Sequence, residues 1–195
     1  MVDLNFLENV LRYSKDALQL ERIKGMDQKI WLPITNLETG LANFYCINDY
    51  DNPFELMLAG CRMPWDKRKF IIHGYPVCDG GLVCQPPVEF TQSLGATEVW
   101  VVSPHSPGHQ LSPWLRGLAA PILGRCAVTR RLIKESAIKE NQLRRRIEGM
   151  KDVKIICPAK PLPIDWRCTN GSLVAETIIL GERAAEAFLS KETSL

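Results

Sequence analysis

The residues of this chain best suited to chemistry are Asp79, Gly80 and Gly81, which lie within the run YPVCDGGLVCQPPV. An aspartate followed by two glycines forms a tight backbone turn, because glycine accepts backbone angles that other residues avoid. Such a turn after a strand can hold the carboxylate at the mouth of a sheet, where it can accept a proton. The structural alternative is an Asx turn, in which the carboxylate only binds the backbone amides of the glycines.

The elements around this turn predict where the carboxylate lies. Phe70–Ile72 and Tyr75–Cys78 flank His73-Gly74 and predict a hairpin that leads into Asp79. After the turn, Pro86-Pro87 opens a helix over Val88–Leu94, closed by Gly95, and the β-branched run Glu98–Val102 predicts a buried strand. A helix followed by an apolar strand is half of a βαβ unit. We therefore expect an α/β fold with a parallel or mixed sheet covered by helices.

The rest of the chain reads as alternating strands and helices. Without a repeat or a linker, we predict a single domain over residues 1–195. The further expected elements are a helix capped by Asp3, a hairpin of Ile30–Leu37 and Phe44–Ile47 in which Pro33 indicates an edge or an irregularity, a helix from Pro53 ended by Pro64, a helical stretch from Trp114 to Met150 broken near Pro121 and Gly124, a strand at Val153–Cys157, a connector at Pro158–Pro163, and a helix from Ser172 to Leu189.

Composition narrows the function class. The chain has 195 residues and a net charge of +2, which does not point to nucleic acid as a partner. We expect no secretion signal, because Met1 leads into Asp3 and Glu8. The apolar stretch Gly117–Gly124 is far shorter than the ~20 residues of a membrane span. These features favour a cytoplasmic protein.

The cysteines and histidines offer weak signals. Seven cysteines without a CxxC pair favour reduced, mostly buried thiols over disulfides or zinc. His105 and His109 lie in a Ser/Pro/Gly-rich segment and favour surface loop histidines over a metal site. Trp65, Trp100, Trp114 and Trp166 favour core or hinge packing over insertion into lipid.

The segment from Arg116 to Lys151 is basic, with ten Lys or Arg against three Glu. One interpretation is attraction to anionic lipid headgroups, which would make the protein peripheral to a membrane. The other, which we favour, is a solvated helix face, because Arg144, Arg145 and Arg146 cannot all lie on one side of a helix.

Several motifs in order resemble the C-terminal part of the patatin-like phospholipases. Asp79-Gly80-Gly81-Leu82 looks like the family's second catalytic motif. The similarity covers almost the whole chain. Its other segments are Leu32–Gly40, the helix Pro53–Met63 ending in Pro64, Pro87-Val88, Leu94–Ala96, the strand Val99–Val102, the connector Cys157–Pro163 and the helix that contains Gly181.

The resemblance implies a fold and an activity. The fold is a three-layer α/β arrangement with a mixed sheet and helices on both faces. The activity is hydrolysis of lipid carboxylic esters by a Ser–Asp dyad, without a metal or organic cofactor. Asp79 matches the general base, and Gly80 and Gly81 match its turn. Two departures are Asn36 in place of the usual acid, and the segment Gly60–Arg62, which is bulkier and more polar than the family's pattern.

The serine half of that dyad is absent. No two glycines are four residues apart, so no GxSxG nucleophile motif exists here, and no glycine-rich oxyanion segment remains. Three explanations stay open: a portion of a larger enzyme, which we favour; a degenerate relative that binds lipid or protein; or a second chain that supplies the serine. Because the absent portion would cover apolar surface, we expect the isolated chain to be marginally stable or to self-associate.

Overall fold

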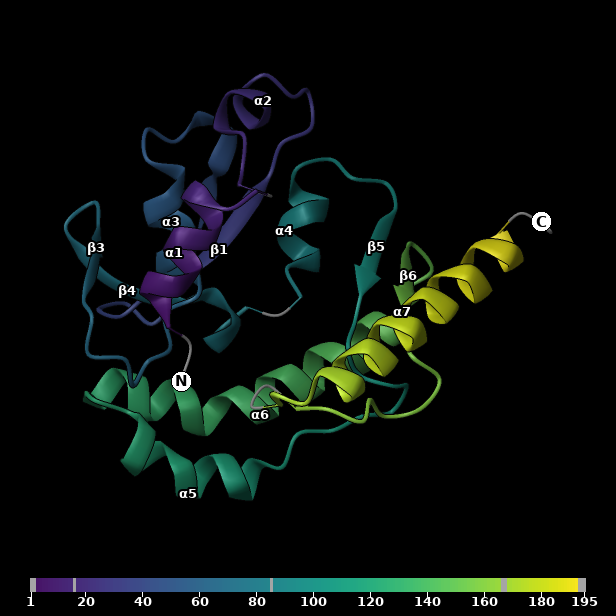
Figure 1. Ribbon diagram of the computed structural model, residues 1–195. Helices are drawn as coiled ribbons and strands as arrows, with labels where there is room; N and C mark the ends of the chain where they lie inside the picture. Colours follow the sequence, from purple (N-terminus) through teal and green to yellow (C-terminus); the bar gives the residue numbers. More distant parts are fainter. Residues whose placement is uncertain (1–2, 16, 85, 166–167, 193–195) are drawn as a thin grey trace. The chain divides into compact units, whose positions relative to one another are not determined.

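The computed structural model describes residues 3–15, 17–84, 86–165 and 168–192 (Figure 1). It is a mixed α/β structure with one four-stranded and one two-stranded sheet. The chain divides into two compact units, the first formed by Met1–Pro86 and Ser112–Glu140 and the second by Pro87–Leu111 and Asn141–Leu195. The single domain expected over residues 1–195 stays a prediction.

The sheet of the first unit is antiparallel throughout, in the order β2-β1-β4-β3. Both expected hairpins are confirmed, and the tight turn between β3 and β4 places His73 and Gly74 at positive φ angles of 50° and 82°. The four strands are β1 (Trp31–Asn36), β2 (Ala42–Cys46), β3 (Phe70–Ile72) and β4 (Tyr75–Asp79).

Pro33 lies in an inner strand of the sheet and not in the edge strand that was one of the two expectations for it. Strand β1 pairs with both β2 and β4, but its pairing with β4 begins only at Ile34, opposite Asp79. Pro33 therefore faces a strand partner on one side alone, and its missing N–H removes no hydrogen bond from the second ladder. The other expectation, an irregularity, corresponds to this ladder between β1 and β4, which stops before it reaches Pro33.

Short helices surround this sheet. Asp3 caps α1 as expected, since its Oδ1 accepts hydrogen bonds from the backbone of Asn5 and Phe6. Helix α3 begins with a proline, whose missing N–H is not needed at a helix start. The helical elements of the first unit are α1 (Leu4–Tyr13), α2 (Leu20–Lys24), η1 (Ile47–Asp49), α3 (Pro53–Gly60), η2 (Gly80–Leu82), α5 (Pro113–Leu123) and the first part of α6 (Ala127–Glu148).

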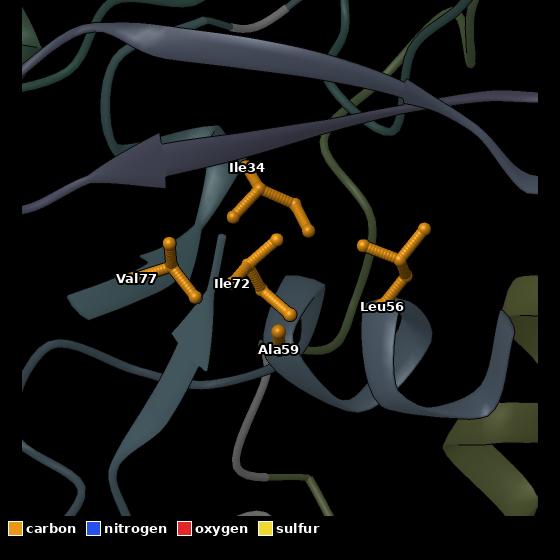
Figure 2. Packing of buried hydrophobic residues seen from close by; sticks show 5 residues of the cluster. All are labelled: Ile34, Leu56, Ala59, Ile72 and Val77. Carbon is orange, nitrogen blue, oxygen red and sulfur yellow. The ribbon is translucent and has the colours of Figure 1, made fainter. Parts of the chain in front are cut away.

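The core of the first unit forms between the sheet and α3. Figure 2 shows Ile34, Ile72 and Val77 from three strands together with Leu56 and Ala59 from the helix, and all five are almost wholly buried. Alternate residues of a strand point to opposite faces, so Ile34 and Val77 share the α3 face. Asp79, two residues after Val77, ends β4 on that same face.

The second unit contains a parallel pair of strands, β5 (Val99–Val102) and β6 (Val153–Ile156). It also holds α4 (Val88–Ser93), the end of α6 and α7 (Gly171–Glu192). The expected parallel or mixed sheet is confirmed only in this pair, since the four-stranded sheet of the first unit is antiparallel. The parallel and the antiparallel strands thus lie in two separate sheets. The sequence could not predict this, because an apolar pattern shows which face of a strand is buried but not which strand lies at its edge.

Two expectations about helices and tryptophans are correct only in part. The break expected near Gly124 is confirmed, because α5 ends at Leu123 and α6 begins at Ala127, whereas Pro121 lies inside α5. Trp114 on α5 is exposed and not part of a core, because α5 packs through its other side, where Ala120 is buried. Trp100 is half-exposed against Phe188, and Trp166 lies outside the described residues.

None of the seven cysteines forms a disulfide, and the prediction that their thiols are mostly buried is wrong. Only Cys78, in β4, is fully buried, and this burial raises the pKa of its thiol to about 12. Cys61 and Cys126 are exposed, because they follow α3 and precede α6 at the surface. Across the described residues, no helix is both long and apolar enough to cross a membrane.

Candidate functional site: the turn after strand β4

The backbone of Asp79 is held in place by hydrogen bonds to two other segments. Its N–H donates a hydrogen bond of 2.8 Å to the carbonyl oxygen of Arg62, just after α3. Its own carbonyl oxygen accepts 2.7 Å from the hydroxyl of Thr35, a fully buried residue of β1. The main chain at the end of β4 is therefore fixed by both its sheet neighbour and the covering helix.

Gly80 occupies a position that admits no side chain. A Cβ atom there would lie 2.8 Å from the Cβ of Pro33 and closer still to the Pro33 carbonyl oxygen. Backbone is hard to displace, so only glycine lets the turn approach β1 this closely. The carbonyl oxygen of Gly80 then accepts hydrogen bonds from the N–H groups of Val83 and Cys84, which close η2.

The Asp79 carboxylate has one fixed oxygen and one open oxygen. Oδ1 accepts a hydrogen bond of 2.7 Å from the N–H of Gly81. Within the described part of the chain, Oδ2 accepts none. The side chain is half-buried, and this burial raises its pKa above the ordinary value of 3.8, while the Gly81 hydrogen bond acts in the opposite direction.

This geometry contains the Asx turn that we considered as the structural alternative. The carboxylate caps the first turn of η2, which is reason enough for an aspartate at this position. The same geometry leaves Oδ2 without a hydrogen-bond donor in the described residues, as a general base requires. The Asx turn and the general base can therefore share one geometry. They differ only in whether a substrate or serine group approaches Oδ2.

Arg62 is a buried residue of this site that the sequence analysis treated only as a departure from a motif. Its guanidinium donates to three backbone carbonyl oxygens: Val77 at 2.7 Å, Asp66 at 3.2 Å, and Arg68. These bonds tie the loop after α3 to β4, directly before Asp79. An arginine at the end of an otherwise small and apolar helix is the signal that could have identified it.

Cys61, the neighbouring residue, lies close to the site. Burial raises the pKa of its thiol, and the carboxylate of Asp79 adds to this effect. A thiol held in the protonated form is a poor nucleophile. The raised pKa therefore gives Cys61 no activation as a nucleophile.

Asn36 lies at the position where the resemblance to patatin-like phospholipases implies an acid. Its Oδ1 accepts hydrogen bonds from the N–H groups of Glu38 and Thr39, at 2.9 and 3.1 Å. Gly40 completes the turn with a positive φ of 74°. An amide oxygen can accept these bonds as a carboxylate does, so the departure keeps the β1–β2 turn intact.

The two loop histidines lie in the second unit, after β5. Their loop position is confirmed, but both rings are half-buried and stack at a centroid distance of 4.2 Å. Asn141 fastens the end of this loop to α6, accepting from the N–H of Leu111 at 2.8 Å and donating to its carbonyl oxygen at 2.9 Å. No group of three or more metal-ligating side chains occurs among the described residues.

Several cations of the basic segment have partners within the protein. Arg146 pairs with Glu89 at 2.6 Å, Lys139 with Glu135 at 2.8 Å, and Arg144 lies 3.4 Å from the Ser103 hydroxyl. Arg144 and Arg146 thus contact different elements of the second unit. The spacing of the three consecutive arginines predicted that they do not form one cationic face, and these contacts agree with that prediction.

Comparison with known proteins gives no assignment: neither a protein-family model nor a curated protein matches this chain. The patatin-like resemblance rests on the motifs themselves and stays a prediction.

Proposed function

We propose that this chain is the C-terminal portion of a patatin-like lipid acyl hydrolase in which Asp79 serves as the general base. The observation that carries the proposal is the carboxylate, with Oδ1 held by Gly81 and Oδ2 free of protein donors in the described residues. A base for a serine hydroxyl needs this combination of a fixed position and one available oxygen.

In the proposed reaction, Oδ2 of Asp79 accepts the proton of the serine hydroxyl as the serine oxygen attacks the ester carbonyl. The proton then passes from Asp79 to the departing alcohol, which leaves an acyl-serine. Asp79 next accepts a proton from water, whose oxygen attacks the acyl group and frees the fatty acid. The proton returns to the serine oxygen, which restores both groups.

The environment of Asp79 suits this role. Burial raises its pKa, which makes the carboxylate a stronger base than an exposed aspartate. Gly80 and Gly81 shape the turn, and Gly80 also lets it approach β1. The serine and the oxyanion donors are supplied by an upstream portion or by a second chain. The reaction needs neither metal nor organic cofactor.

The alternative is a non-catalytic relative that binds lipid or protein. The Asx turn favours it, because the contact with Gly81 alone accounts for the aspartate. In either case we propose a lipid or acyl-ester ligand, a cytoplasmic location and a tendency of the isolated chain to self-associate. Exposed apolar side chains on the second unit, such as Val102 and Ile178, support that tendency.

The test begins with the native product in the source cells. An antibody raised to this chain should detect a band well above its own mass of 22.0 kDa, or one of that size that co-purifies with a serine-bearing chain. The purified product should react with a fluorophosphonate probe for active serines and hydrolyse p-nitrophenyl acyl esters.

The decisive variant is Asp79→Asn in that native product. We expect ester hydrolysis to fall by about 10²–10⁴-fold, the usual contribution of a positioned base. Asp51→Asn, on an exposed loop, is the matched control and should retain activity. Hydrolysis that survives Asp79→Asn unchanged would remove Asp79 from the mechanism. A lone chain of the native size that binds lipid without turnover would support the binding alternative.

A further inference from the structure

Helix α5 presents an apolar face to solvent. Four large side chains, Trp114, Leu115, Leu118 and Ile122, are between 55% and 83% exposed. Pro121, which lies among them, is exposed as well. Single exposed apolar residues are ordinary, but a contiguous group of this size on one helix marks a surface that contacts another apolar phase.

These side chains share one side of the helix. At 100° per residue, positions 114, 115, 118, 121 and 122 fall within an arc of about 120°. The buried residue of α5, Ala120, lies on the opposite side, and the single charged residue, Arg116, lies outside the arc. We call the exposed set, residues 114, 115, 118, 121 and 122, the α5 apolar face.

The charges that flank this face in the sequence have one sign. Between Glu98 and Glu135 the sequence contains no Asp or Glu, whereas it contains Arg116, Arg125, Arg130, Arg131 and Lys134. Arg125 and Arg130 donate to the carbonyl oxygens of Asp66 and Gly124, so no carboxylate in the described residues neutralises them. Both are exposed; Arg125 lies between α5 and α6, and Arg130 lies in the first turn of α6.

We propose that the α5 apolar face is a docking surface for an anionic lipid bilayer. A short helix with Trp and Leu on one side and cations beside it lies in the plane of the interface, with the apolar side chains among the acyl chains and the cations at the headgroups. A second copy of this chain fits less well, because it would bring like charges together around the contact.

This surface differs from the basic segment considered in the sequence analysis. Its principal contact is apolar and lies on α5, and the arginines contribute only at its border. The proposal extends the proposed function, since it names the surface that would bring a lipid hydrolase to its substrate. Docking itself requires neither Asp79 nor a serine, so Asp79→Asn should leave vesicle binding unchanged.

The test is flotation of the full 195-residue chain with phosphatidylcholine vesicles, with and without phosphatidylserine. We expect stronger binding to the phosphatidylserine vesicles, weakened by added salt. Ile122→Glu and Leu118→Glu should each weaken this binding about tenfold or more, because each change removes an apolar side chain from the acyl region and places a negative charge there. Both residues are exposed, so circular dichroism should show an unchanged fold.

Leu41→Glu is the matched control, since Leu41 is 66% exposed in the same unit but lies outside α5. It should bind vesicles as the unaltered chain does. Equal loss in Leu41→Glu and Ile122→Glu would overturn the proposal, as would binding that ignores phosphatidylserine. If size-exclusion chromatography without lipid shows a dimer that Ile122→Glu dissociates, and vesicles do not bind, the face joins two copies of this chain instead.

Discussion

The two units bury their strands to different degrees. In the first unit, a four-stranded antiparallel sheet closes over α3, and the side chains that meet there are almost wholly buried. In the second unit, β5 and β6 form a parallel pair in which β5 alternates between buried and exposed residues, and no described residue of α7 is fully buried. Among the described residues each strand of this pair has one strand neighbour, and the residues on one face of β5 stay exposed.

The difference shows where the chain lacks covering elements. Parallel strands in proteins are normally buried on both faces, yet Trp100 and Val102 of β5 are exposed. The candidate site lies in the first unit, where Asp79, Thr35 and the Arg62 carbonyl form a closed set of contacts. The site is therefore built on the better packed part of the molecule. Substitutions in the two units should accordingly differ in their effect on the free energy of unfolding.

The largest effect is expected at the turn beside Asp79. Gly80→Ala forces a Cβ atom against the Pro33 backbone, and neither segment can move without breaking the sheet. We expect a loss of at least about 3 kcal/mol in the free energy of unfolding, comparable to severe overpacking. Urea denaturation measures it. A loss below about 1 kcal/mol would mean that the turn relaxes away from β1.

Three valine-to-alanine changes compare the units with identical chemistry. Val77 in the first unit is 1% exposed, whereas Val101 and Val102 of the second unit are 8% and 78% exposed. We expect losses of about 2–3 kcal/mol for Val77→Ala, about 1–2 for Val101→Ala and under 0.5 for Val102→Ala. Denaturation monitored by circular dichroism gives all three values. A cost for Val102→Ala as large as that for Val77→Ala would contradict the exposure of β5.

Asp79 should make stability depend on pH in an unusual direction for a carboxyl group. Its folded-state pKa is raised, so its contribution to stability is fully present below the ordinary value of 3.8 and is lost as the pH rises through the raised pKa. Asp79→Asn removes this loss, because an amide does not titrate in this range.

Urea denaturation of both proteins across this pH range tests the sign. The free energy of unfolding of Asp79→Asn should improve relative to the unaltered chain as the pH rises. The exposed Asp51→Asn serves as the control for loss of charge alone. A relative improvement on acidification instead would show that the Gly81 hydrogen bond outweighs burial and lowers the pKa.

The last prediction is a small gain in stability in the second unit. Gly181 lies inside α7, and a Cβ atom added there meets no atom within 4 Å. Gly181→Ala should therefore stabilise the helix by about 0.5–1 kcal/mol, the difference in helix propensity. The melting temperature should rise slightly. A clear fall would mean that something packs against this side of α7 in solution.

The sequence alone determined the features that depend on neighbouring residues. The His73-Gly74 turn, the cap at Asp3 and the Asp79-Gly80-Gly81 turn were all predictable, because a few adjacent residues set their backbone angles and hydrogen bonds. The sequence also predicted a strand at Val99–Val102 after a helix, whereas the parallel pairing of this strand with β6, which follows only after α5 and α6, was not predicted.

Only the tertiary structure decided the features that join distant residues. The contact of Gly80 with Pro33, the burial of Arg62 and the division of the strands between two sheets depend on segments far apart in the chain. The same holds for the α5 apolar face, since Trp114 in a sequence looks equally suited to a core. Local patterns specify which residues are apolar, whereas exposure depends on what the rest of the chain places over them.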